Sequence, residues 1–307
     1  MILNILFIVI GIVLVLWGAD RLTDGAVAVA EKMKMPQIVI GLTIVAMGTS
    51  MPEFCVSLIS ALKGTSDLAV GNIVGSNIFN TLLIVGVSAL VAPMSIMKTT
   101  VRKDIPFALV ASALLLIMCL DGDISRIDAA ILFVMFLIFM YITLRGAKAQ
   151  GTDLEEKEKK SMATWLSVVW ILVGLACLIG GSNLFVDGAT AVATKLGVSE
   201  AVIGLTIVAG GTSLPELATS VVSARKGNSG IAIGNVLGSN VFNILAILGL
   251  TGVISPMTLK GITMTDLSMM VISIILIWLF SFTKYKIERW EGAILTAVFV
   301  GYIYSLL

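Results

Sequence analysis

GLTIVAMGTSMPEFCVSLISALKGTSDLAVGNIVGSNIFNTLLIVG (residues 41–86) recurs as GLTIVAGGTSLPELATSVVSARKGNSGIAIGNVLGSNVFNILAILG (residues 204–249), without a gap and at an offset of 163 residues. Of the 46 aligned positions, 28 are identical. Outside this stretch, the same offset matches Asp24 to Asp187 and Pro93 to Pro256. Self-similarity over this length indicates that the chain consists of two copies of one unit.

The composition of the 307 residues excludes an ordinary water-soluble domain. Hydrophobic residues make up 58% and charged residues 13%, and the mean hydropathy is +1.07. These values predict an all-α integral membrane protein. Apolar runs long enough to span a bilayer lie near residues 2–19, 37–61, 68–92, 105–120, 126–144, 165–186, 200–224, 230–254, 266–282 and 290–306. The sequence therefore predicts ten transmembrane helices, five in each copy.

Because five is odd, the chain enters the second copy from the opposite side of the membrane, so the two five-helix repeats are inverted. This is the plan of many secondary transporters. We expect the first repeat at 1–144, a cytoplasmic linker at 145–164, and the second repeat at 165–307. The linker carries the one dense charge run, at 153–160, whose mixed signs are typical of a solvated segment.

The basic residues of the loops predict the orientation. Loops that follow odd-numbered helices hold fifteen Lys and Arg residues, and the other loops hold four. Because basic loops face the cytoplasm, both termini are expected to be extracytoplasmic, in a multi-pass protein of the plasma membrane. The first run has no Lys or Arg before Arg21, so it is expected to be a mature helix and not a signal peptide.

Several function classes are excluded by what the sequence lacks. The formal charge of +1 leaves no basic surplus for nucleic acid. Histidine is absent, which removes the commonest general base and metal ligand. Cys55, Cys119 and Cys177 lie in apolar runs without CxxC spacing, so neither a disulfide framework nor a zinc site is expected. We predict no cofactor, no enzymatic activity, and a protein that functions as a monomer in the lipid bilayer.

Two carboxylates, Glu53 and Glu216, fall at equivalent positions inside apolar runs, each directly after a proline. An acid within the membrane costs at least a few kcal/mol on insertion scales, so a partner is needed. Pro52 is expected to loosen the helix around residues 46–48 and to free backbone carbonyls there. The equivalent residues in the second copy are 209–211.

Neutral oxygen donors accompany the two carboxylates. The next helix of each copy carries a polar stripe at i, i+4 and i+8, which comprises Asn72, Ser76 and Asn80 or Asn235, Ser239 and Asn243. Hard oxygen ligands without sulfur or imidazole suit Ca²⁺ or Na⁺. Two ionised carboxylates would be neutralised by one Ca²⁺ or by two Na⁺, so the same oxygens could serve both ions in alternation.

The motifs GTSMPE (48–53) with GNIVGSNIFN (71–80), and GTSLPE (211–216) with GNVLGSNVFN (234–243), resemble the two alpha repeats of the calcium/cation antiporter superfamily, in its prokaryotic sodium/calcium exchanger branch. The resemblance covers the whole chain. It implies Na⁺-driven Ca²⁺ exchange by alternating access, with the first and sixth helices sliding past a core of the other eight. The ion ligands that it implies are Glu53, Glu216, Thr49, Ser50, Ser76, Asn80, Thr212, Ser213, Ser239 and Asn243, with the carbonyls of Ala46 and Ala209.

Asn243 departs from some relatives, including potassium-dependent exchangers, which have an acid at this position. A Ca²⁺/H⁺ antiporter on the same fold is the main alternative, because carboxylates can also carry protons. A cation channel and an intramembrane protease are remote alternatives, since a protease dyad would leave the Asn and Ser stripes unexplained. Asp24 and Asp187 are expected to face water, although a role in gating access stays open.

The loop charges give a prediction of topology. A single cysteine introduced at Lys148 should be protected from a membrane-impermeant reagent added outside, because the linker is expected in the cytoplasm. A cysteine at Leu307 should be labelled. Labelling at 148 but not at 307 would overturn the assignment.

Overall fold

The computed structural model describes residues 2–150, 162–197, 209–259 and 261–306, and helices dominate this part of the chain. The first half contains α1 (Ile2–Lys32), α2 (Gln37–Ile40), η1 (Gly41–Val45), α3 (Ala46–Thr49), α4 (Met51–Leu62), α5 (Ser66–Ile78), η2 (Phe79–Ile84), α6 (Val85–Val91), β1 (Met94–Ser95), η3 (Thr100–Asp104), α7 (Ile105–Met118), η4 (Cys119–Asp121), β2 (Asp123–Ile124) and α8 (Arg126–Gln150). The second half contains α9 (Thr164–Lys195), α11 (Ala209–Thr212), α12 (Leu214–Arg225), α13 (Ser229–Val241), η7 (Phe242–Leu248), α14 (Gly249–Ile254), β3 (Met257–Thr258), α15 (Met264–Ser281), β4 (Lys286–Ile287) and α16 (Arg289–Leu306).

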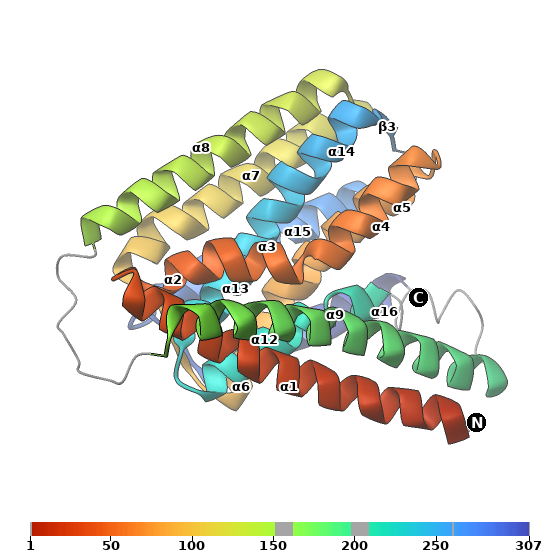
Figure 1. Cartoon of the computed structure of the whole chain (residues 1–307). Coiled ribbons are helices and arrows are strands. Elements are labelled where there is room, and N and C mark those ends of the chain that lie inside the picture. The colour runs from red at the N-terminus through yellow and green to blue at the C-terminus, as the bar shows by residue number, and fades with distance from the viewer. Residues whose placement is uncertain (1, 151–161, 198–208, 260, 307) are drawn as a thin grey trace.

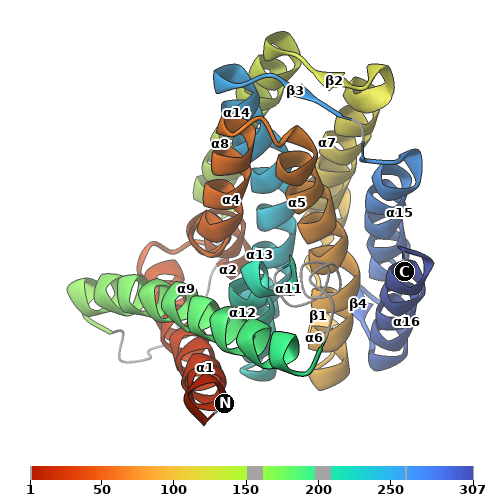
Figure 2. The same cartoon turned by 90° about the vertical axis from the view of Figure 1, so that its right-hand side faces the viewer.

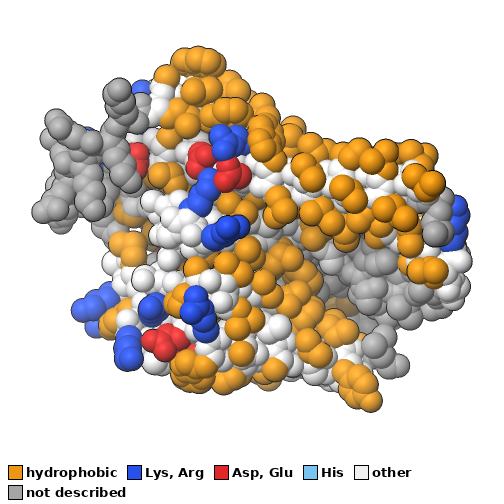
Figure 3. Space-filling view, turned by 90° about the horizontal axis from the view of Figure 1, so that it is seen from below, with side chains coloured by type: hydrophobic (Ala, Val, Ile, Leu, Met, Phe, Trp, Pro, Cys, Tyr) orange, Lys and Arg blue, Asp and Glu red, His pale blue; other side chains and the backbone are white. Residues whose placement is uncertain are grey.

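The described residues include seven helical segments long and apolar enough to cross a membrane, or eight if the bent pair Gln37–Thr49 and Met51–Leu62 counts as one span. The predicted run at 200–224 falls partly outside the described residues. An exposed apolar surface accompanies these spans, for example at Ile2, Leu3, Ile5 and Leu6 of α1. Figure 3 shows hydrophobic side chains over the N-terminal half of α1 and charged ones gathered toward the other end. These features are those of a multi-pass integral membrane protein.

Burial divides the helices into a centre and a periphery. In the segment Ser229–Ile254, which comprises α13, η7 and α14, every residue of the most apolar 18-residue stretch is buried. In the corresponding stretches of α1 and α9, 22% and 28% of the residues are buried. Figures 1 and 2 show α1 and α9 side by side across one side of the molecule, with α13 near its middle. The segment that carries the second polar stripe therefore lies at the centre of the molecule.

The helices α1 and α9 are longer than the apolar runs 2–19 and 165–186 predicted. They extend to Lys32 and Lys195. The extra turns are rich in small and polar residues, which lower the hydropathy but pack well between helices. Thr23 and Gly25 of α1 and Gly188 of α9 are all buried there.

Two short antiparallel strand pairs join the two halves of the chain, and the hydropathy pattern does not predict them. Strand β1 pairs with β4, with Met94 opposite Ile287, and β2 pairs with β3, with Ile124 opposite Met257. At the 163-residue offset, β1 is equivalent to β3 and β2 to β4. Each half thus pairs its strands with the other half and not with itself.

Glycines spaced seven residues apart form the contact between α1 and α9. A Cβ atom on Gly18 would lie 2.8 Å from the Gly174 carbonyl oxygen, and one on Gly11 would lie 2.7 Å from that of Gly181. A Cβ on Gly25 would lie 2.7 Å from the Ser167 carbonyl oxygen. The order of these contacts makes the helices antiparallel. Their backbones touch along a seam that no side chain could enter, as in other small-residue contacts between membrane helices.

This seam predicts opposite outcomes for two neighbouring glycines. Gly181→Ala places its methyl group 2.8 Å from Leu14 Cβ, whereas a Cβ on Gly180 meets no atom within 4 Å. Gly181→Ala should lower the stability by about 1–3 kcal/mol through overpacking. Gly180→Ala should leave it unchanged or raise it slightly, because alanine favours helix. Thermal unfolding in detergent measures both, and equal effects would contradict the seam.

Candidate functional site

The two prolines of the motifs each begin a new helix. Between α3 and α4 the backbone leaves helical geometry at Ser50 (φ −84°, ψ 10°), and the helices on either side meet at 48°. In the second half the equivalent break is at Ser213 (φ −91°, ψ 7°). Pro52 and Pro215 lie in the first turns of α4 and α12, where a missing N–H breaks no hydrogen bond.

The break lies at Ser50, directly after residues 46–48, where the sequence predicted the loosening. The Ala46 carbonyl accepts a hydrogen bond from Ser50 N (3.0 Å), whereas the single hydroxyl proton of Thr49 goes to Asn235 Oδ1 (3.0 Å). Pro52 lies in the first turn of the helix that begins after this break. Glu53 and Glu216 consequently lie in the first turns of α4 and α12, where a helix dipole favours negative charge.

The two carboxylates are buried and are bonded in a crossed pattern. Glu53 is 1% exposed and Glu216 is 0% exposed. Ser50 Oγ donates to Glu216 Oε1 (2.8 Å), and Ser213 Oγ donates to Glu53 Oε1 (3.0 Å). Each acid is thus held by the serine of the opposite half, and the two motifs meet in one site, as the sequence predicted.

The first asparagine of each stripe holds the backbone and does not face the acids. Asn72 Nδ2 donates to the Glu53 carbonyl (3.2 Å), and Asn235 Nδ2 donates to the Glu216 carbonyl (3.2 Å). Thr49 Oγ1 donates to Asn235 Oδ1 (3.0 Å). These bonds fix the helices that carry the acids relative to the helices that carry the stripes.

The later residues of the stripes lie in the site itself. Ser76 Oγ is 3.3 Å from Ser213 Oγ, and Ser239 is fully buried on the equivalent stripe. Among the buried oxygens of the described residues that have no hydrogen-bond partner are four carboxylate and carboxamide oxygens of predicted ligands: Glu53 Oε2, Glu216 Oε2, Asn80 Oδ1 and Asn243 Oδ1. The hydroxyl of Ser239, another predicted ligand, is also unpaired. Leaving a buried acceptor unpaired is costly, and more so for a charged one. Unpaired oxygens of this kind are what a bare cation requires.

The remaining predicted ligands are placed less completely. Thr212 ends α11 beside Ser213 and lines a cavity. Ala209 is the first residue of α11, directly after residues that the structure does not describe. The positions of these two are compatible with the site.

Asn77 and Asn240 lie next to the predicted polar stripes but are not among the residues that the sequence predicted for the site. Both are fully buried, and both bond to residues of the opposite half. Asn80 and Asn243 lie in the π-helical segments η2 and η7, an irregularity common at functional sites. The recurrence of both residues in GSN (75–77) and GSN (238–240) was the available signal.

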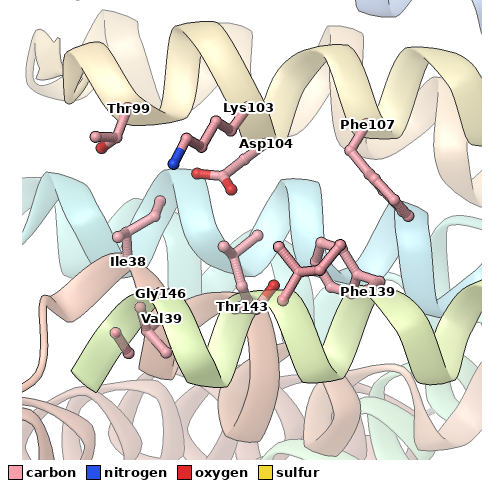
Figure 4. A pocket seen from close by; sticks show the side chains of 12 residues that line it. Ile38, Val39, Thr99, Lys103, Asp104, Phe107, Phe139, Thr143 and Gly146 are labelled. Atoms are coloured by element: carbon pink, nitrogen blue, oxygen red, sulfur yellow. The ribbon is translucent and has the colours of Figure 1, made fainter. Parts of the chain in front are cut away.

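Two cavities open beside the site. One of about 500 Å³ is lined by Pro52, Thr212 and Asp187, among others, and one of about 490 Å³ includes Ser76 and Gly210 in its lining. A third, of about 290 Å³, lies between α2, α8 and the start of α7, with Lys103 and Asp104 against apolar walls (Figure 4). This third cavity includes none of the predicted ligands. The first two provide space through which an ion could reach the acids.

Asp24 does not simply face water, which corrects the expectation for this residue. Its carboxylate lies 2.6 Å from Lys226 Nζ and 3.4 Å from Arg21 Nη2, and Lys226 also contacts Asp20 at 2.6 Å. The pairing was invisible in sequence because Lys226 is 202 residues away. Its equivalent, Asp187, is exposed and lines the 500 Å³ cavity. The two equivalent acids therefore lie in different surroundings.

Comparisons with known proteins match the chain over nearly its whole length. The family model described as sodium/calcium exchanger protein matches residues 3–145 and 166–307. Inner membrane protein YrbG of Escherichia coli is 36% identical over 100% of this chain and 97% of its own, and sodium/calcium exchanger MaX1 of Methanosarcina acetivorans is 32% identical over 99% and 98%. A structure of the sodium-calcium exchanger NCX_Mj, soaked with Na⁺ and Ca²⁺, superposes with a TM-score of 0.88 at 32% identity, over 100% of this chain and 99% of that one.

The four unpaired oxygens predict that Ca²⁺ stabilises the folded protein. At 100 times its Kd, a ligand adds about 2.7 kcal/mol, so CaCl₂ should raise the thermal unfolding temperature in detergent. Glu216→Gln should abolish most of the increase, because it removes one of two charges at the site. Glu291→Gln, which removes a buried acid at the start of α16, should retain it. An unchanged increase in Glu216→Gln would place the ion elsewhere.

Proposed function

Because the chain belongs to the sodium/calcium exchanger protein family, we propose that it exchanges Na⁺ for Ca²⁺ across the membrane at the site between Glu53 and Glu216. The observation that carries this proposal is the set of four buried, unpaired oxygens from both halves. A protein of this family is a transporter and not an enzyme. Ion gradients drive the exchange, and no cofactor is needed.

The ligand set combines two charges with neutral oxygens. The free carboxylate oxygens of Glu53 and Glu216 provide about −2, which one Ca²⁺ or two Na⁺ would balance. The Ala46 carbonyl accepts one hydrogen bond, from Ser50 N, and has a second lone pair for the ion. The full set that we propose is Glu53, Glu216, Thr49, Ser50, Ser76, Asn80, Thr212, Ser213, Ser239 and Asn243, with the carbonyls of Ala46 and Ala209.

The architecture that supports exchange is a pair of inverted five-helix repeats, which gives ten transmembrane helices. The first repeat spans 1–144 and the second 165–307, joined by the linker 145–164. Equivalent hydrogen bonds in the two directions support this arrangement. Ser50 of the first half donates to Glu216 of the second, and Ser213 of the second half donates to Glu53 of the first. The exchanged strand pairs follow the same relation.

Alternating access would move α1 and α9 past the other helices. The cavity at Asp187 leaves the site open on one side, while Lys226 closes on Asp24 at the other side. The loop charges make the open side extracytoplasmic. We therefore propose an outward-open state of a plasma-membrane protein, with both termini outside. The complete site lies within one chain, which supports function as a monomer.

Flux of ⁴⁵Ca²⁺ into proteoliposomes tests the function. Vesicles loaded with Na⁺ should take up ⁴⁵Ca²⁺, and Na⁺-free vesicles with only a pH gradient should not. Glu53→Gln and Glu216→Gln should each reduce uptake at least about 100-fold, since an uncompensated charge in the membrane costs a few kcal/mol. Glu291→Gln is the matched control and should transport normally. Uptake driven by the pH gradient alone would favour Ca²⁺/H⁺ antiport. Ca²⁺ flux down its own gradient, with no counter-ion required, would favour a channel.

Potassium should have no effect on exchange. Asn243 contributes a neutral carboxamide, so K⁺ bound together with Ca²⁺ would leave an uncompensated positive charge in a low-dielectric site. Uptake driven by Na⁺ should proceed at full rate with K⁺ absent on both sides. Loss of uptake without K⁺, and its return when K⁺ is added, would refute the two-carboxylate site.

A further inference from the structure

We propose that Asn77 and Asn240 are positioning residues, which orient the carboxamides of Asn80 and Asn243 so that oxygen and not nitrogen faces the cation. This inference rests on the proposed function, because it assigns a role at the same site. Neither residue is among the ligands proposed above. Both are fully buried between the two halves of the chain.

The need for such residues follows from the chemistry of the side-chain amide. A carboxamide has an acceptor oxygen at one end and two N–H donors at the other, and the two ends have nearly the same shape. Rotation by 180° would turn the NH₂ group toward the ion and replace a ligand by a repulsive donor. A neutral ligand of this kind is therefore useful only if its other end is held.

Asn77 fixes the orientation of Asn243. Asn77 Nδ2 donates to the backbone carbonyl of Asn240 (3.2 Å), and a carbonyl can only accept. Asn77 Oδ1 must therefore point the other way, where it accepts from Asn243 Nδ2 (3.0 Å). Because the nitrogen of Asn243 is committed to this bond, its unpaired oxygen is directed into the site.

Asn240 fixes Asn80 through a second chain of bonds. Thr81 Oγ1 donates its one proton to the Asn77 carbonyl (2.6 Å) and can then only accept from Asn240 Nδ2 (2.7 Å). Asn240 Oδ1 is left to accept from Asn80 Nδ2 (3.2 Å). The unpaired oxygen of Asn80 is thereby directed into the site as well.

Both chains of bonds begin at a backbone carbonyl and end at a proposed ligand oxygen. Each also crosses between the halves, since Asn77 orients Asn243 and Asn240 orients Asn80. A backbone carbonyl cannot rotate or exchange donor for acceptor, so the orientation does not depend on the bound ion. The site is thus arranged for a cation before the cation arrives, which lowers the cost of binding.

Variants at Asn77 and Thr81 test this assignment in purified protein. Asn77→Ala releases Asn243, and Thr81→Val removes the hydroxyl that fixes Asn240 without touching the site. Each should weaken equilibrium ⁴⁵Ca²⁺ binding about tenfold and raise the Ca²⁺ concentration for half-maximal uptake equally. The maximal uptake rate should change little. Thr81→Ser, which keeps the hydroxyl, should bind like the unmodified protein.

Thr43→Val provides the matched control. Thr43 is also buried, and its hydroxyl donates to the Val39 carbonyl of its own helix (2.7 Å), as that of Thr81 does to Asn77. Thr43→Val should leave Ca²⁺ affinity unchanged. The unfolding temperature without Ca²⁺ should be similar in Thr43→Val and Thr81→Val, which separates positioning from general stability.

The outcomes distinguish the two proposals. If the unmodified protein binds Ca²⁺ and Glu216→Gln does not, but Asn77→Ala and Thr81→Val bind normally, the positioning role is wrong and the exchange site stands. If Asn77→Ala does not fold, Thr81→Val with its Thr81→Ser rescue decides. If the unmodified protein binds no Ca²⁺, the proposed function itself is wrong.

Discussion

The burial of two carboxylates where the motif helices meet is the constraint on which the rest of the structure depends. A charge removed from water needs either a partner or hydrogen bonds. Glu53 and Glu216 receive one serine hydroxyl each and keep one oxygen unpaired. The protein therefore supplies part of the compensation, and in the proposed exchange site a bound cation would supply the rest. The breaks at Ser50 and Ser213, which place both acids in first turns, serve the same need.

Neither half of the chain completes this site alone. The serine that bonds each acid comes from the opposite half, and so does the asparagine that holds each carboxamide. The strand pairs join the halves in the same exchanged manner. The repetition of the sequence explains this pattern, because equivalent residues of the two halves make equivalent contacts with the opposite half. Assembly of the halves and assembly of the site are consequently one event.

Most of the site was predictable because it depends on residue type and on repetition. Two Pro-Glu pairs and two polar stripes in apolar runs are sufficient to place Glu53 and Glu216 together. The exact backbone was not predictable. The π-helical segments at Asn80 and Asn243, and the position of the helix break at Ser50, depend on how neighbouring helices pack. The Asp24 pair with Lys226 and the strand pairs depend on contacts between distant residues, which hydropathy does not record.

The glycine seam between α1 and α9 bears on how an ion gradient is conserved. Contact between two backbones, at Gly11 with Gly181 and at Gly18 with Gly174, leaves no flexible side chain to absorb a relative shift. The two helices are therefore expected to move together as one rigid body. In the alternating access proposed above, one rigid body that uncovers one face of the site would cover the other face in the same movement. A continuous pore, through which ions would leak down their gradients, would require the seam itself to separate.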